Sequence, residues 1–230
     1  KSANQIGLLS EEEETQNDII NDIEDWKFEE RLSKEFEAVG FFISDHPLNQ
    51  FTEIFDDYKI INYSKFNLED ETKESNIAAT LLKLQERKTA KGNSYAVLKL
   101  TDLSSVFEIF IFSDVLELNR EILKEGNSLI LTLVKNISND ENRFKRINVQ
   151  KIASLKDLFN SPIKEVLFEV KSNQEVDEIS KLINENGNTT VNINFLIDDK
   201  NVKFTLKNPR NLDRKSLNLL RKREISSTIS

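Results

Sequence analysis

Residues 76–112 read NIAATLLKLQERKTAKGNSYAVLKLTDLSSVFEIFIF, and this stretch decides the fold. It holds three apolar runs, at residues 77–84, 95–100 and 106–112, each short enough to be a strand. The second and third runs alternate between two faces, which is typical of half-buried strands. Gly92-Asn93 lies between the first two runs and is a hairpin signal. The stretch therefore predicts three consecutive antiparallel strands.

The pattern continues with one helix and two more strands. Ser113 is a good N-cap for a helix over residues 114–125, and a glycine follows at its end. Apolar runs at residues 129–134 and 143–152 come next, separated by a polar turn. Five strands with one helix between the third and the fourth form the element order of an OB-fold. This small Greek-key barrel binds oligonucleotides on one face. We therefore predict a five-stranded OB-fold barrel over residues 76–155.

The flanking segments make the whole chain an α+β protein. Residues 1–25 are acidic and poor in apolar side chains, so we expect a flexible segment. Residues 26–75 predict a short helical connector, with apolar residues three to four apart over 26–39 and Pro47 in the first turn of a second helix. Residues 163–223 predict a small β-α-β-β-α module, and we expect the last seven residues to fray.

The composition excludes several classes of protein. Cysteine is absent and there is one histidine, which rules out disulfides, thiolate metal sites and multi-histidine metal sites. No apolar run is long enough to cross a membrane and no secretory signal opens the chain, so we expect a cytoplasmic protein without a membrane partner. Methionine is absent too, and we therefore expect the chain to be part of a longer or processed protein.

The net charge of −8 comes from the start of the chain. Residues 1–30 carry ten acidic and two basic residues, which leaves 30 acidic and 30 basic residues in the other 200. Because the acidity is local, it does not argue against a nucleic-acid site in the rest of the chain.

The sequence predicts no catalytic centre. The five glycines form no phosphate-binding loop. His46 has no nucleophile or carboxylate set beside it in the sequence, and its place before Pro47 predicts a role at a helix entrance. The acidic pairs Asp56-Asp57 and Asp198-Asp199 fit polar turns, where charges are normally solvated. We expect no catalytic residue, no metal site and no cofactor in this chain.

A binding surface is better supported. Between Lys83 and Lys99 there are five bases and one acid, and Tyr95 shares the alternating face of Lys99. Cations bind phosphates and exposed rings stack on bases, so this hairpin predicts a site for single-stranded nucleic acid. Phe107, Phe110 and Phe112 are expected to lie mostly in the core. The predicted nucleic-acid-binding residues are Lys83, Arg87, Lys88, Lys91, Asn93, Tyr95, Lys99, Arg143, Lys145 and Arg146.

A second motif lies in the acidic segment. Gln5, Leu8 and Leu9 form a Gln-x-x-Leu-Leu pattern, in which an amide and two adjacent apolar side chains can fill a pocket on a partner. On the pattern alone, the alternative is a chance match in a loop.

Three segments together resemble the C-terminal part of the bacterial DNA polymerase III alpha subunit family. They are the Gln5 motif, EFEAVGFFISDHPL at residues 35–48, and the OB stretch with LSSVFEIFIF at residues 103–112. Asp45 stands where glycine is usual in that family. The resemblance runs from Gln5 to about residue 220 and is looser after residue 162.

The resemblance carries several expectations. It implies that the catalytic aspartates and their metal ions lie in an upstream domain of a DNA-directed DNA polymerase. It implies that the OB domain binds single-stranded template DNA and that Gln5, Leu8 and Leu9 bind the sliding clamp, with Leu9 in place of the usual phenylalanine. It also implies that the C-terminal module contacts the tau subunit of the clamp loader.

Two other interpretations remain open from the residues. One is an OB-type RNA-binding module, such as the anticodon-binding domain of an aminoacyl-tRNA synthetase; residues 163–230 are too short to supply the catalytic domain that would follow. The other is an interaction scaffold in which the basic hairpin is merely solvated.

Overall fold

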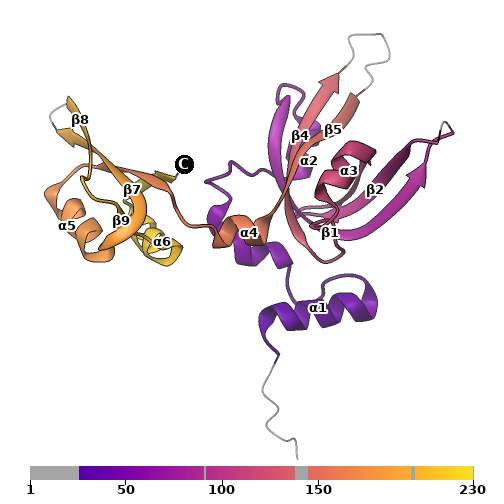
Figure 1. The fold of residues 1–230 in the computed structure, drawn as a ribbon, viewed down its shortest axis with the longest axis horizontal. Helices are drawn as coiled ribbons and strands as arrows, with labels where there is room; N and C mark the ends of the chain where they lie inside the picture. Colours follow the sequence, from indigo (N-terminus) through magenta and orange to yellow (C-terminus); the bar gives the residue numbers. More distant parts are fainter. Residues whose placement is uncertain (1–25, 91, 138–144, 198–199, 230) are drawn as a thin grey trace, which may run out of the picture.

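The computed structural model describes residues 26–90, 92–137, 145–197 and 200–229. Figure 1 shows an OB-type sheet, a smaller C-terminal module beside it, and helical segments between and below them. The predicted α+β class is confirmed. The buried apolar residues form three groups: one inside the OB-type sheet, one inside the C-terminal module, and one where the helical connector packs against the OB-type sheet.

The five predicted strands form one antiparallel sheet in the order β3-β2-β1-β4-β5. A helix, α3, separates β3 from β4, as the OB-fold requires. The bounds are β1 Glu74–Lys88, β2 Ser94–Thr101, β3 Val106–Phe112, α3 Ser113–Asn119, β4 Ser128–Ile137 and β5 Lys145–Ser154.

The sheet curls because β1 changes its pairing partner along its length. Its first half pairs with β4 and its second half pairs with β2, and the register shifts between Leu81 and Lys83. A shift of this kind bends and twists a strand. β3 and β5 come close to each other at the open side, without a hydrogen-bonded ladder between them in the described part of the chain. The result is a partly open barrel rather than a closed one, filled by buried side chains such as Leu98, Ile111 and Leu131.

Helix α3 is shorter than predicted. It ends at Asn119, and its N-cap position is Phe112, so Ser113 is not the cap. The prediction failed because the following turns must return to β1. The Gly126 N–H donates to the Leu81 carbonyl at 2.7 Å, and the Leu81 N–H donates to the Asn127 carbonyl at 2.9 Å. Gly126 has a φ of 88°, which glycine adopts without the strain of a side chain.

The connector contains α1 (Phe28–Val39), the 3₁₀ helix η1 (Pro47–Ile54) and α2 (Tyr63–Leu68). His46 lies at the N-terminus of η1, where its Nδ1 accepts from the Leu48 N–H at 3.2 Å. Its Nε2 is 3.5 Å from Thr101 Oγ1, and burial lowers the pKa of the ring. The predicted role at a helix entrance is confirmed. η1 packs with α4 (Leu155–Asn160) under the β1–β4 side of the sheet.

The C-terminal module contains the predicted elements and two further strands. β6 pairs in parallel with β7, and the sheet order is β10-β6-β7-β8, with β9 on β7. The prediction that the last seven residues fray is wrong for Ser226–Ile229, which form β10 on the edge of β6. Buried Ile225 holds this end in place. The bounds are β6 Glu165–Val170, α5 Asn173–Leu182, β7 Asn184–Ile197, β8 Lys200–Thr205, β9 Arg210–Asn211, α6 Arg214–Lys222 and β10 Ser226–Ile229.

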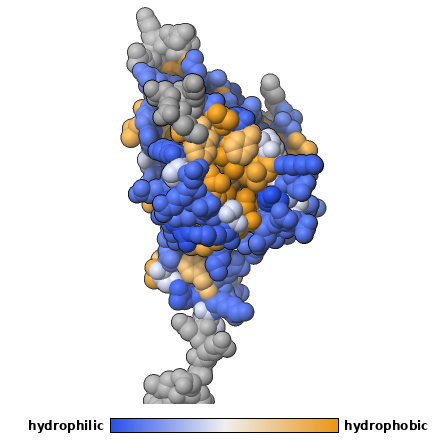
Figure 2. All heavy atoms as spheres, turned by 90° about the vertical axis from the view of Figure 1, so that its left-hand side faces the viewer, coloured by the Kyte–Doolittle hydropathy of each residue, from blue (hydrophilic) through white to orange (hydrophobic). Residues whose placement is uncertain are grey.

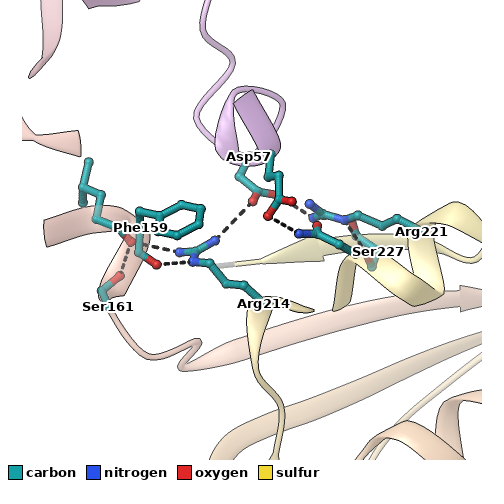
Figure 3. Close-up of polar contacts among 9 residues, drawn as sticks. Asp57, Phe159, Ser161, Arg214, Arg221 and Ser227 are labelled. Atoms are coloured by element: carbon teal, nitrogen blue, oxygen red, sulfur yellow. Dashed lines mark hydrogen bonds and ion pairs between the residues drawn. The ribbon is translucent and has the colours of Figure 1, made fainter. Parts of the chain in front are cut away.

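A buried carboxylate joins the connector to this module (Figure 3). The Asp57 side chain is 4% exposed; its Oδ1 lies 2.5 Å from the Arg221 guanidinium and its Oδ2 lies 3.7 Å from that of Arg214. Arg214 also donates to the Phe159 carbonyl at 2.7 Å. The prediction that both acids of the Asp56-Asp57 pair are solvated is therefore wrong for Asp57, because two arginines of α6 meet it. The pair Asp198-Asp199 lies outside the described residues.

Gly187 is required by a close crossing of two segments. A Cβ at this position would overlap the backbone of Arg210 and Asn211, where β9 lies against β7.

We expect Gly187→Ala to lower the free energy of unfolding of the module by about 1–3 kcal/mol, since the backbone must shift. Urea unfolding followed by circular dichroism measures the loss. Asn188→Ala, at an exposed neighbouring position, is the control and should leave the midpoint nearly unchanged; an equal loss in both variants would contradict the steric explanation.

Candidate nucleic-acid interface

The outer face of β2 and β3 carries exposed aromatic side chains. Phe110 is 56% exposed and Phe112 is 48% exposed, whereas Phe107 is 7% exposed. The expectation that all three lie mostly in the core is thus confirmed only for Phe107. It failed for the other two because β3 turns only its odd-numbered side chains inward. On the outer face Phe112 pairs across the strands with Tyr95.

The rings of Tyr95, Phe110 and Phe112 take part in two contacts at the open side of the barrel. The Tyr95 and Phe110 rings are 6.4 Å apart between centroids. The Arg146 guanidinium reaches from β5 to within 5.6 Å of the Phe112 ring centre. An arginine over an aromatic face is a cation–π contact. The contact between Arg146 and Phe112 therefore connects β5 to β3, the two strands that would pair with each other in a closed barrel.

A cleft of about 820 Å³ lies between β3, β5 and the end of the β1–β2 hairpin. Its lining combines aromatic, apolar and basic side chains. At its base Tyr63 stacks on Phe107 with the ring centroids 3.9 Å apart, and burial raises the pKa of the Tyr63 hydroxyl. The lining residues are Tyr63, Asn67, Lys88, Thr89, Ala90, Tyr95, Glu108, Ile109, Phe110, Phe112, Lys145, Arg146, Ile147 and Asn148.

The structure brings four of the ten predicted nucleic-acid-binding residues into this cleft. They are Lys88, Tyr95, Lys145 and Arg146. Lys145 already has two partners within the chain: its Nζ lies 2.8 Å from Asp70 Oδ1 and donates to the Asn67 carbonyl at 2.6 Å.

Four more of the predicted residues lie outside the cleft lining. Lys83 and Lys99 are exposed and directly opposite each other on β1 and β2. Arg87 is exposed opposite Tyr95. Asn93 holds the hairpin loop: its N–H donates to Thr89 Oγ1 and its carbonyl accepts from the Thr89 N–H.

Five of the predicted site residues lie outside the described part of the chain. They are Lys91, Arg143, Gln5, Leu8 and Leu9.

The segment that follows α3 braces the hairpin that carries the basic residues. Arg120 donates to Glu86 on β1 at 2.7 Å and to Glu117 at 2.7 Å. These hydrogen bonds lower the pKa of both carboxyls and raise that of the guanidinium. The Leu84 N–H also donates to Glu125 at 3.1 Å. The hairpin is thereby tied to the barrel where it extends beyond β4 and β5 (Figure 1).

Sequence reasoning missed a buried lysine beneath the cleft. Lys135 is 3% exposed, and its Nζ donates to the carbonyls of Phe66 and Glu69 in and after α2. It also lies 4.4 Å from the centre of the Phe66 ring. Burial lowers the pKa of Lys135. Because α2 carries Tyr63 and Asn67, this lysine holds the base of the cleft in place, and nothing in the strand pattern around it indicates that role.

The described residues contain no group of three or more histidine, cysteine, aspartate or glutamate side chains placed to hold a metal ion. None of the helices in the same part of the chain is both long enough and apolar enough to span a membrane.

The chain is similar in sequence to DNA polymerase III alpha subunits. It is 32% identical over 151 residues to the alpha subunit of Rickettsia conorii, a match that covers 65% of this chain and 12% of the relative. For Rickettsia bellii the identity is 30% over 177 residues, covering 74% and 15%, and for Escherichia coli it is 24% over 131 residues, covering 56% and 11%. The predicted resemblance is confirmed. The chain spans about one eighth of the length of these curated relatives.

Comparisons with family models and with solved structures give two further findings. No protein-family model matches the chain. A structure of a replication protein A heterotrimer bound to single-stranded DNA covers 63% of this chain, with a TM-score of 0.31 and 14% identity.

Proposed function

We propose that this chain is a non-catalytic C-terminal region of a replicative DNA polymerase alpha subunit and that its cleft binds single-stranded template DNA. The similarity to alpha subunits supports the family assignment. The observation that carries the binding role is the cleft itself, which places Tyr95, Phe110 and Phe112 beside Lys88 and Arg146. DNA synthesis, the metal ions that it needs and its catalytic residues belong to an upstream part of the longer polymerase, in the cytoplasm.

The geometry suggests how an unpaired strand is held. Bases stack on the exposed faces of Phe110 and Phe112, while Lys88 and Arg146 neutralise the phosphates between them. Stacking of this kind accepts every base, because each has a π-face. A duplex keeps its bases stacked on one another, so these rings favour single strands. The site therefore suits a template whose sequence changes at each step of synthesis.

The basic hairpin supplies the salt-dependent part of the affinity. We expect the triple replacement of Arg87, Lys88 and Lys91 by alanine to weaken oligo-dT binding and to reduce the slope of log K against log salt by up to about two units, because each phosphate contact on a single strand adds about 0.7. Fluorescence anisotropy at several salt concentrations measures the slope.

The matched control replaces three exposed lysines outside the sheet, Lys34, Lys171 and Lys215, and should leave the slope unchanged. An unaltered slope in the hairpin variant would remove these bases from the DNA path, and salt-independent binding of the intact chain would favour the scaffold interpretation. Tighter binding of folded tRNA than of oligo-dT would favour the RNA-binding interpretation.

We further propose two protein contacts, both suggested by the family resemblance. Gln5, Leu8 and Leu9 bind the sliding clamp, and the C-terminal module contacts the tau subunit of the clamp loader.

Deleting residues 5–9 is expected to abolish capture of the chain on immobilised clamp while oligo-dT binding stays intact. Surface plasmon resonance on immobilised clamp measures the capture. Capture that survives the deletion would mean that this motif is not the clamp contact.

A further inference from the structure

Helix α2 forms the floor of the cleft at the open side of the barrel. It is held from both sides: Tyr63, at its start, stacks on Phe107 of β3, and the Asn67 carbonyl, one turn later, accepts from Lys145 of β5. Because residues four apart lie on one face of a helix, Tyr63 and Asn67 share a face of α2. Both residues are partly buried and line the cleft. A short helix with two polar side chains thus spans the gap between β3 and β5.

Three polar side chains in the lining have no hydrogen-bond partner among the described residues. They are the Tyr63 hydroxyl, the Asn67 amide and the amide of Asn148 on β5. Other partly or fully buried asparagines are paired: the Asn76 amide bonds with Tyr58 and Thr132, and that of Asn192 bonds with Glu165 and Thr205. A side-chain amide offers two donors and an acceptor. The floor therefore has free hydrogen-bonding capacity that the chain itself does not use.

The charges of the lining differ between its two ends. At one end Arg146 contacts Phe112, and exposed Lys88 lies at the end of the hairpin. Glu108 is the only acid among the described lining residues, and it directly follows the residue on which Tyr63 stacks. It lies four residues before Phe112, which is about 13 Å along an extended strand. Since a carboxylate repels phosphate and accepts from donors, phosphates fit the Phe112 end and a base fits the floor.

The exposed apolar surface of the C-terminal module lacks such groups. Figure 2 shows apolar atoms gathered in the middle of that end of the molecule, surrounded by polar ones. A groove of about 250 Å³ in the same module has neither an aromatic ring nor an amide among its described lining residues. The cleft of the barrel, at about 820 Å³, is as large as pockets that enclose small ligands, which span about 300–1,000 Å³. The cleft has both the room and the partners for a nucleobase.

We propose that the floor of the cleft binds the Watson–Crick edge of one unpaired base of the bound strand, through the Asn67 and Asn148 amides and the Tyr63 hydroxyl. The Watson–Crick edge of every base places a donor beside an acceptor, and an amide that turns over presents the complement in either order. The floor thus accepts all four bases, but only while they are unpaired. This inference rests on the proposed single-strand binding and specifies which atoms of the strand are recognised.

The test compares labelled oligonucleotides bound to the full chain. In 3-methylthymine the ring and the phosphates are those of oligo-dT, but a methyl group replaces the N3–H in the middle of the Watson–Crick edge. We expect the oligonucleotide of 3-methylthymine to bind at least about fivefold more weakly than oligo-dT in fluorescence anisotropy, because a hydrogen bond is lost and its partner in the floor is left unpaired. Oligo-dU lacks only the C5 methyl group, away from this edge, and should bind as oligo-dT does.

Substitutions in the chain assign this difference to the floor. Leucine has nearly the shape of asparagine but no hydrogen-bonding group. The double variant Asn67→Leu, Asn148→Leu should bind oligo-dT only as tightly as the methylated oligonucleotide, and its affinity for the methylated one should equal that of the unmodified chain. A misfolded variant would lose both affinities, and circular dichroism checks the fold. Asn201→Leu, at an exposed position on β8, is the matched control and should keep the full difference.

Three results would overturn the inference. Equal binding of oligo-dT and the methylated oligonucleotide would mean that stacking and charge alone hold the strand, and it would leave the proposed function standing. A difference that persists in the double asparagine variant excludes these amides as its source. Absence of oligo-dT binding to the unmodified chain removes the proposed function, and this inference with it.

Discussion

Phe112→Ala is expected to weaken oligo-dT binding about 5- to 150-fold. The ring is 48% exposed in the cleft, and loss of one stacked base costs about 1–3 kcal/mol. The same change removes the ring on which Arg146 rests, so the guanidinium loses its fixed position as well. Anisotropy titration at one fixed salt concentration measures the effect.

Two further variants separate stacking from general damage to β3. Phe112→Trp keeps a π-face and should retain most of the affinity. Val106→Ala removes a 57% exposed side chain from the same face of the same strand, outside the cleft lining, and should have no effect. If Val106→Ala is as harmful as Phe112→Ala, or if Phe112→Ala binds normally, the rings do not stack on bases.

Asp57→Ala is expected to lower the stability of the docked C-terminal module by about 3 kcal/mol. Removing one partner of a buried ion pair leaves the other charge without compensation, at a cost of about 3–5 kcal/mol, and the partial exposure of Arg221 places this case at the lower end. Hydrogen exchange of α6 and β10 should rise, and small-angle scattering should show a larger radius of gyration, because the module is freed from the connector.

The neighbouring acid provides the control. Asp56 is exposed, and Asp56→Ala should change neither measurement. Asp57→Asn keeps the shape but removes the charge, and we expect it to resemble Asp57→Ala. Unchanged exchange in Asp57→Ala would show that the ion pairs contribute little and that the apolar contacts of η1 and α4 hold the module instead.

The strand pattern predicted the barrel because alternation is a local property. Val106–Phe112 was predicted with its observed bounds, and the turn at Gly92 separates β1 from β2 as expected. The same pattern did not reveal which face of β3 is covered. Phe107, Ile109 and Ile111 are as apolar as Phe110. Only the curl of the sheet buries these three side chains and leaves Phe110 exposed.

The sequence by itself determined the α+β class, the succession of five barrel strands along the chain with a helix after the third, the basic hairpin and the resemblance to polymerase alpha subunits. Hydrophobic periodicity, turn residues and charge run along the chain, so each can be recognised without knowing what lies next to it in space. Only the tertiary structure placed Arg146 over Phe112, buried Lys135 under the cleft and set Asp57 between two arginines. These contacts join residues 34 to 164 positions apart, and the burial and pairing that govern them exist only once the strands and helices have packed.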